Sequence, residues 1–281
     1  MRIGAPVFGW NDPESWALKH VEMGYGAAYF PLDCTSDPER IDAFAEAAAR
    51  HGLVIAEIGV WNNQLERDPA TRQANFNYAV GQLRLADRVG AKCCVNISGS
   101  LGETWDGPAR DNLTEETYRR VVENVRAIIG AARPERTYFT LEPMPWMFPH
   151  TVADLERLIR DVDMERFAVH VDMCNMIRSF DLVYDSGRLV REFFRAFGPL
   201  IRVVHAKDTV IGGHLTLHID EAIPGRGLFD YDALLTACGE LYPDLPVMAE
   251  HLDTEEEYRQ ATDFLKDKAA ELGVNVLRGR A

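Results

Sequence analysis

The sequence lacks several features that would place it in a particular class of protein. No apolar run reaches the ~18 residues of a membrane-spanning helix, and the N-terminus lacks the apolar stretch of a signal peptide. The five cysteines are odd in number, and none lies in a Cys-x-x-Cys pair. We therefore expect a cytoplasmic protein with reduced thiols, not a secreted protein built on disulfides.

Positive charge is also scarce. The 281 residues include 30 Lys and Arg against 44 Asp and Glu, which gives a net charge of −14. Nucleic acids and anionic membrane surfaces bind basic patches, so this balance argues against both as partners. The hydrophobic content of 47% is ordinary for a globular protein, and the length suits one barrel or two small domains.

Strand-like apolar runs alternate with amphipathic helical patterns along the whole chain. We predict eight strands, at 2–8, 26–30, 53–58, 92–97, 137–142, 167–172, 200–206 and 245–250. Helix starts are marked by Asp37, which precedes a proline, and by Thr151, which precedes Asp154 in a capping pattern. Eight such units predict an α/β fold, a single (β/α)8 TIM barrel over residues 1–281.

An open, doubly wound sheet is the alternative fold. Such a sheet normally carries a glycine-rich phosphate-binding turn after its first strand, whereas this segment reads FGWNDP. No linker or low-complexity segment divides the chain. The connections 98–113, 174–186 and 207–229 are long for a compact domain, and we expect them to build the substrate site.

Residues that can bind a metal stand at the ends of the last four predicted strands: Glu142, Asp172, His205 and Glu250. The C-terminal ends of barrel strands meet at one face, where barrel enzymes carry out their chemistry. Three carboxylates and one imidazole form a mainly hard ligand set. This set suits one divalent metal, Mn²⁺ first, with Mg²⁺, Co²⁺ and Zn²⁺ left open.

The same four residues suggest a reaction. A metal bound to a ketone and its neighbouring hydroxyl stabilises the enediolate that forms when a C–H proton leaves. Glu142 and Glu250 would each give one oxygen to the metal and keep the other free as an acid or base. Asp172 and His205 would only hold the metal.

Several other residues are candidates for the substrate site. Those for substrate binding are Glu57, Trp61, Lys207, Arg226 and His218. Glu57 would bind substrate hydroxyls, support the metal ligands or form a structural ion pair, and Lys207 would bind a substrate oxygen or pair with a glutamate. His150 follows a stiff, proline-rich aromatic loop beside Glu142 and is either a catalytic base or the residue before a helix cap. Trp61, Trp105 and Trp146 all follow predicted strands, where aromatic rings would suit the apolar faces of sugars.

Short segments follow one another in a characteristic order: Leu141-Glu142-Pro143, Val171-Asp172, His205-Ala206-Lys207-Asp208, Pro224-Gly225-Arg226-Gly227 with Asp230-Tyr231, and Glu250-His251. In this order the chain resembles the xylose-isomerase-like TIM barrels, in their sugar isomerase and ketose 3-epimerase branch. The resemblance runs over nearly the whole chain. It implies that the matching Glu, Asp, His and Glu bind one metal, and that the two glutamates move protons on opposite faces of a keto-sugar.

Two positions depart from the family pattern. The family often has a histidine three residues after the aspartate, where this chain has Asn175. Its Pro-Gly-Glu-Gly loop reads Pro-Gly-Arg-Gly here, with Arg226 in place of the glutamate. We expect both changes to affect substrate contacts more than the metal.

The resemblance implies an isomerase or epimerase acting on a small carbohydrate, and it leaves alternatives open. A lyase would use the same metal and base to expel the aglycone of a 3-oxo-glycoside, including C-glycosides, as some relatives do together with a small β-rich partner subunit. A phosphodiesterase related to endonuclease IV would need more histidine ligands and a basic surface. A non-catalytic protein would not need the intact set of four ligands. The sequence does not choose between a monomer and a homo-oligomer.

Overall fold

The computed structural model describes residues 1–281 and contains the predicted barrel. Eight parallel strands are hydrogen-bonded in the order β1-β10-β7-β6-β5-β4-β3-β2. Their bounds are β1 (Arg2–Gly4), β2 (Ala27–Tyr29), β3 (Val54–Gly59), β4 (Cys93–Asn96), β5 (Phe139–Leu141), β6 (Phe167–Asp172), β7 (Ile201–Ala206) and β10 (Pro246–Ala249). All eight predicted strands are confirmed, although the first ends at Gly4, not at residue 8.

The sheet closes on itself where β1 meets β2. The amide of Gly26 donates a hydrogen bond to the carbonyl of Ile3 at 2.9 Å. A Cβ atom at Gly4 would lie 2.3 Å from the carbonyl oxygen of Ala27, so this close approach requires glycine. The result is a nearly closed barrel, and the open doubly wound sheet is excluded.

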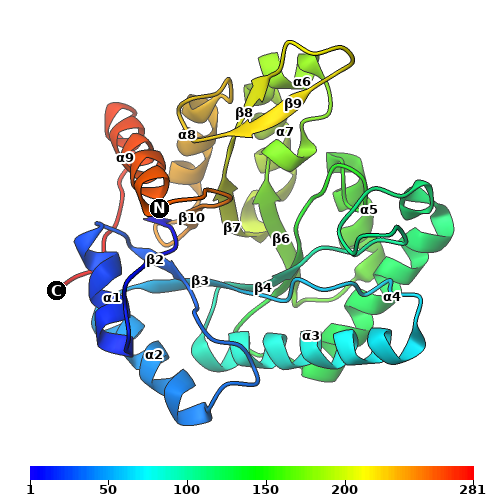
Figure 1. Ribbon diagram of the computed structural model, residues 1–281, viewed down its shortest axis with the longest axis horizontal. Coiled ribbons are helices and arrows are strands. Elements are labelled where there is room, and N and C mark those ends of the chain that lie inside the picture. The colour runs from blue at the N-terminus through cyan, green and yellow to red at the C-terminus, as the bar shows by residue number, and fades with distance from the viewer.

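Helices surround the barrel and connect its strands (Figure 1). They are α1 (Pro13–Glu22), α2 (Pro38–Arg50), α3 (Pro69–Val89), α4 (Glu115–Ala132), α5 (Val152–Val162), the short α6 (Phe180–Tyr184), α7 (Ser186–Phe197), α8 (Tyr231–Leu241) and α9 (Glu255–Glu271). The predicted caps are confirmed, because Asp37 accepts from the amide of Glu39 and Thr151 from that of Asp154. None of the helices has the length and apolarity that crossing a bilayer requires.

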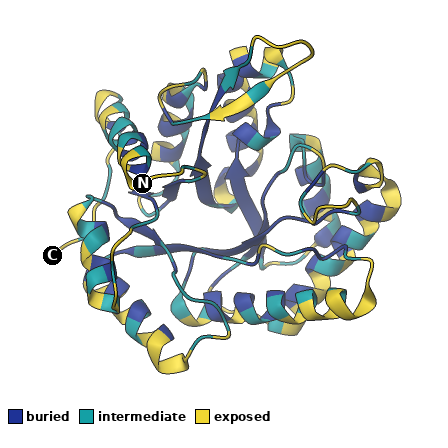
Figure 2. Cartoon of the chain, viewed as in Figure 1, coloured by how far each residue is buried: buried dark blue, intermediate teal, exposed yellow.

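The core lies within the strands and on the inner faces of the helices (Figure 2). β4 and β6 are buried at every residue, as expected of strands covered on both sides. On α4 the predicted apolar face is buried: Val121, Val122, Val125, Ile128 and Ile129. Outward-facing helix surfaces are exposed, so the helices form one polar shell around the barrel.

A β-hairpin occupies the long connection after β7, for which the sequence predicts only a loop. Its antiparallel strands are β8 (Asp208–Ile211) and β9 (Ile219–Ala222), and they project beyond the barrel strands (Figure 1). The carboxylate of Asp208 anchors the hairpin by accepting from the amides of Gly225, Gly227 and Phe229 at 2.9, 3.0 and 2.9 Å. This places the Pro-Gly-Arg-Gly loop at the base of the hairpin.

The C-terminal segment after α9 runs across the opposite end of the barrel. The amide of Leu277 donates to Met1 O at 2.9 Å, that of Gly279 to Tyr25 O at 2.8 Å, and that of Arg280 to His51 O at 2.8 Å. These acceptors precede β1, β2 and β3. The segment therefore joins the first three strands at their N-terminal ends.

Candidate metal centre

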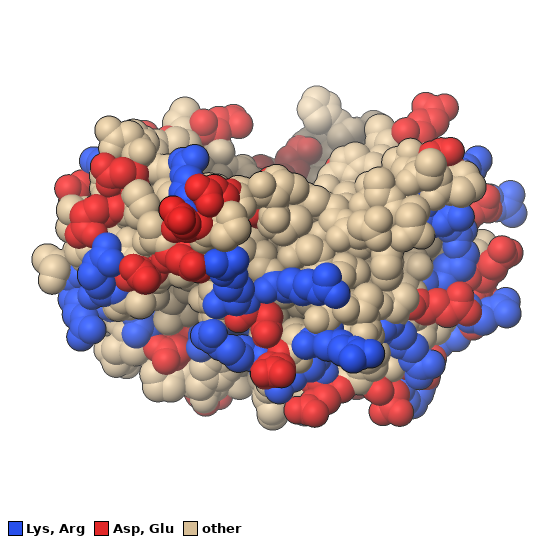
Figure 3. Space-filling view, turned by 90° about the horizontal axis from the view of Figure 1, so that it is seen from below, with Lys and Arg blue, Asp and Glu red and all other residues tan.

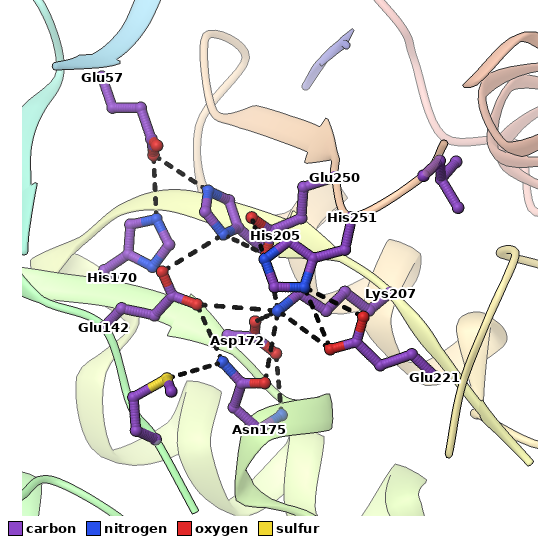
Figure 4. A network of polar contacts seen from close by, with 12 residues as sticks. Glu57, Glu142, His170, Asp172, Asn175, His205, Lys207, Glu221, Glu250 and His251 are labelled. Atoms are coloured by element: carbon purple, nitrogen blue, oxygen red, sulfur yellow. Dashed lines mark hydrogen bonds and ion pairs between the residues drawn. The ribbon is translucent and has the colours of Figure 1, made fainter. Parts of the chain in front are cut away.

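The four predicted ligands converge at the C-terminal ends of adjacent strands. Glu142 follows β5, Asp172 ends β6, His205 lies in β7 and Glu250 follows β10. Each offers one ligand atom, and these atoms all lie within 4.8 Å of one another (Figure 4). The structure thus brings together the whole set that the strand ends predicted, at the face of the barrel where chemistry takes place.

Three of these side chains present a buried atom that makes no hydrogen bond of good geometry: Asp172 Oδ2, His205 Nδ1 and Glu250 Oε1. His205 Nδ1 lies 2.6 Å from Glu250 Oε1 and 3.6 Å from Glu142 Oε2. Buried polar atoms are normally paired, and unpaired ones call for a missing partner. Oxygen and nitrogen atoms that converge on one point in this way fit a shared cation.

The charges of the cluster also fit a cation. The buried ammonium of Lys207 lies 2.8 Å from Asp172 Oδ2, 3.0 Å from Glu250 Oε1 and 3.9 Å from Glu142 Oε1. Burial raises the pKa of Asp172 to about 7, even though Lys207 opposes this shift. Burial lowers the pKa of His205, but Glu250 and the other surrounding carboxylates outweigh it and raise the pKa well above its usual range. Even with Lys207 and His205 both positively charged, the four carboxylates of Glu57, Glu142, Asp172 and Glu250 carry the larger charge, and a divalent ion would neutralise the excess.

Glu57 stands behind His205 and orients it. Its Oε2 atom lies 3.2 Å from His205 Nε2 and 3.0 Å from Nε2 of His170, and all three side chains are buried. Burial raises the pKa of Glu57, but His205 and His170 outweigh this and lower it to about 2. An ionised carboxylate accepts the Nε2 proton of His205, and this contact turns Nδ1 towards Glu250 and the candidate metal site.

Asn175, where the family often has histidine, contacts two candidate ligands. It lies in a short 3₁₀ turn (Cys174–Met176), which turns the chain back over the end of β6. Its Nδ2 donates to Glu142 Oε1 at 2.9 Å, and its backbone amide donates to Asp172 Oδ1 at 3.0 Å. Asn175 also lines the cavity, so the expected effect on substrate contacts stays a prediction, and its hydrogen bonds make it a support of two candidate metal ligands as well.

A cavity of about 1010 Å³ lies over the candidate metal centre. Its lining includes the glutamates of the site together with Asn175, Glu221 and His251. All three long connections contribute to it, through Trp105 after β4, Asn175 after β6 and Glu221 in the hairpin. The connections that looked too long for a compact domain therefore do enclose this cavity.

The other predicted site residues divide into two groups. Trp61 and Glu57 line the cavity, and Lys207 lies within the carboxylate cluster. His150, Arg226 and His218 do not line the cavity and contact local partners. His150 Nδ1 lies 2.8 Å from Asp154 Oδ2 at the start of α5, Arg226 donates to Gln260 of α9, and His218 Nδ1 lies 3.4 Å from Thr216 O.

Sequence reasoning missed His170 and Glu221. His170 precedes Asp172 by two residues in β6, so both point into the barrel, and this parity could have identified it. Glu221 comes from β9 and lies 3.0 Å from His251 Nδ1 and 3.6 Å from Lys207 Nζ. No local sequence signal marks it, because only the hairpin brings it to the site.

Charges of both signs are interspersed on the face of the molecule in Figure 3. Lys and Arg side chains gather across the middle of this face, with Asp and Glu side chains between and around them. The chain as a whole carries a net charge of −14.

The structure is a (β/α)8 barrel, and three carboxylates and one histidine form a candidate metal centre at the C-terminal ends of its strands. A family model described as xylose isomerase-like TIM barrel matches residues 15–268. The chain therefore belongs to the xylose isomerase-like TIM barrel family. No curated protein sequence matches the chain significantly.

Solved structures with the same fold share little sequence with this chain. A xylose isomerase-like TIM barrel protein from Mycobacterium smegmatis in complex with magnesium is 18% identical, with a TM-score of 0.68 over 93% of this chain and 90% of that one. The 3-keto-D-glucoside 4-epimerase from E. coli is 18% identical, with a TM-score of 0.70 over 95% and 99%. Endonuclease IV from Thermus thermophilus is 17% identical, with a TM-score of 0.71 over 96% and 100%. Identities this low establish the shared fold alone.

Proposed function

We propose that the chain is a divalent-metal-dependent isomerase or epimerase that moves a proton next to the carbonyl of a keto-sugar. The observation that carries this proposal is the convergence of Glu142, Asp172, His205 and Glu250 on one buried point beneath the cavity. A 3-keto-D-glucoside 4-epimerase and a magnesium-bound protein among the structural neighbours support it. The net charge of −14 favours it over a nuclease.

Glu142, Asp172, His205 and Glu250 would hold the metal. The bound ion would supply positive charge that stabilises the negative charge arising on the carbonyl oxygen as the neighbouring proton leaves. The mainly hard ligand set favours Mn²⁺ or Mg²⁺ over Co²⁺ and Zn²⁺. Glu57 and Asn175 would keep His205 and Glu142 in their binding orientations.

Glu142 and Glu250 would carry the proton. They follow β5 and β10, which are separated in the sheet by β6 and β7, so they approach the cavity from two sides. Burial raises the pKa of Glu250, but His205 and Lys207 outweigh it and hold the pKa well below its usual range. An ionised carboxylate can accept a proton, so one glutamate would remove it from the sugar, and the other, after taking up a proton from solvent, would return that proton to the opposite face.

Solvent deuterium exchange tests this function. Protein loaded with Mn²⁺ is incubated in D₂O with a panel of keto-sugars and 3-oxo-glycosides, and products are followed by NMR. We expect deuterium at the carbon next to the carbonyl together with a new isomer, loss of both after chelation, and recovery on adding Mn²⁺. Release of an aglycone without a new isomer would replace the epimerase by the lyase, and a metal-loaded protein that exchanges no sugar would contradict both.

A further inference from the structure

The cavity is larger than a single sugar needs. Its volume of about 1010 Å³ is at the upper end of the roughly 300–1,000 Å³ typical of pockets for drug-sized ligands. The candidate metal ligands come from β5, β6, β7 and β10, and a keto-sugar held there would cover only that part of the floor. The remaining space lies under the loops that follow β3, β4 and β5.

Three tryptophans line the cavity on that side. Trp61 follows β3, Trp105 follows β4 and Trp146 follows β5. Their exposed fractions are 42%, 38% and 36%, so each indole keeps a large free surface. Exposed apolar side chains that are scattered over a surface carry no special meaning. When several gather in one concave site, they mark a place where apolar groups bind.

Two of these tryptophans are fixed by their surroundings. The Nε1 of Trp146 donates to the carbonyl of Asp106 at 2.7 Å, which ties the loop after β5 to the loop after β4. Trp61 has a φ of +47° and turns its ring back over Gly59, where a Cβ atom would lie 1.9 Å from the indole Nε1. A preformed wall of this kind binds a flat group with little loss of conformational entropy.

Two polar side chains on the same side of the cavity, those of Gln82 and Asp33, already accept hydrogen bonds from the protein. The amide of Gln82 accepts from Cys34 N at 2.7 Å and donates to Gly59 O at 2.8 Å. Oδ1 of Asp33 accepts from Thr35 N at 2.8 Å. The indole N–H of Trp146 donates to the carbonyl of Asp106. A second sugar would bring several hydroxyls that need partners, whereas an aromatic ring needs none.

We propose that Trp61, Trp105 and Trp146 form a subsite for an aromatic group attached to the sugar. The substrate class is then a sugar or glycoside with an aryl substituent, not a free monosaccharide. The inference rests on the proposed function only for the position of the sugar over the candidate metal ligands. The subsite itself is built from residues outside the metal centre.

Calorimetric titration of the full chain tests the subsite with phenyl β-D-glucoside and methyl β-D-glucoside as probes. We expect the phenyl compound to bind at least about tenfold more tightly, with or without Mn²⁺. Trp61→Ala and Trp146→Ala should each remove most of that preference. Tyr184→Ala, which removes a 73% exposed aromatic side chain outside the cavity, should leave it unchanged. Circular dichroism would establish that each variant is folded.

Three results would overturn the subsite. Equal affinities for the two glucosides, or no binding of either, would do so. Cellobiose binding as tightly as the phenyl glucoside, and losing affinity in the same tryptophan variants, would assign the space to a second sugar. If the protein prefers the phenyl glucoside but exchanges no deuterium into keto-sugars, the proposed function is contradicted and the subsite is still supported.

Discussion

The Oε2 atom of Glu57 lies 3.2 Å from Nε2 of His205, on the side of the imidazole away from the candidate metal ligands. Because an ionised carboxylate only accepts, Nε2 carries a proton, and Nδ1 is the ring nitrogen that would give its lone pair to a metal. Glu57→Gln removes this constraint. We expect the Mn²⁺ affinity measured by calorimetry to fall by about 10- to 100-fold.

Glu14→Gln is the matched control for that variant. Glu14 Oε1 lies 2.7 Å from His51 Nε2, so it forms a comparable carboxylate–histidine pair outside the cavity. The control should bind Mn²⁺ as the unchanged protein does. Equal affinities in both variants would show that Glu57 does not position His205 for a metal.

Glu142→Gln and Glu250→Gln separate metal binding from proton transfer. Glutamine keeps a carbonyl oxygen for the metal but cannot act as a base. Metal content should fall modestly, while deuterium exchange falls by about 10²–10⁴. Asp172→Ala should lose metal and activity together, since no proton role is proposed for Asp172. Normal exchange in both glutamine variants at full metal occupancy would leave the two glutamates as ligands only.

Lys207→Met removes the ammonium of the carboxylate cluster. Breaking such a buried pair costs about 3–5 kcal/mol in the free energy of unfolding. We expect this loss in metal-free protein and a smaller one with Mn²⁺, because the metal compensates the same carboxylates. Urea unfolding with and without Mn²⁺ measures the difference, and Lys266→Met, which removes an ion pair to the half-exposed Asp263, serves as control. Equal losses under both conditions would argue against a metal among these carboxylates.

His20 should make stability depend on pH. Its Nδ1 donates to Trp16 O at 2.9 Å, and burial lowers its pKa from 6.5 to about 4. Between these values the unfolded chain binds a proton that the folded chain does not, so stability falls as pH falls from about 6.5 towards 4. The loss from pH 7 to pH 5 should be about 2 kcal/mol. Denaturant unfolding of His20→Gln should show a shallower pH dependence, whereas the exposed His218→Gln should keep the original slope.

Local sequence patterns predicted much of this molecule because the barrel is built from local repeats. The eight strands followed from apolar runs, and Asp37 and Thr151 marked helix starts through hydrogen bonds to amides two or three residues ahead. The convergence of the four candidate metal ligands followed from their positions at strand ends, since parallel strands bring those ends to one face. Each of these inferences needed only neighbouring residues and the rule that joins them.

Residues whose roles depend on distant contacts could not be predicted in the same way. The role of Glu57 depends on His205 and His170, which are brought beside it only by barrel closure. Glu221 reaches Lys207 because an unpredicted hairpin folds over the site. His150 and Arg226 appeared plausible from their loops, but Asp154 and Gln260 hold them elsewhere.

The C-terminal segment that joins β1, β2 and β3 has a consequence for how this chain can diverge. Its hydrogen bonds use backbone atoms at the end of the barrel away from the candidate metal centre. The loops around the cavity can then change length and composition without loosening the closure of the first three strands. Selection for new substrates and selection for a stable barrel can thus act on separate parts of the chain, which accords with neighbours of this fold superimposing at 17–18% identity.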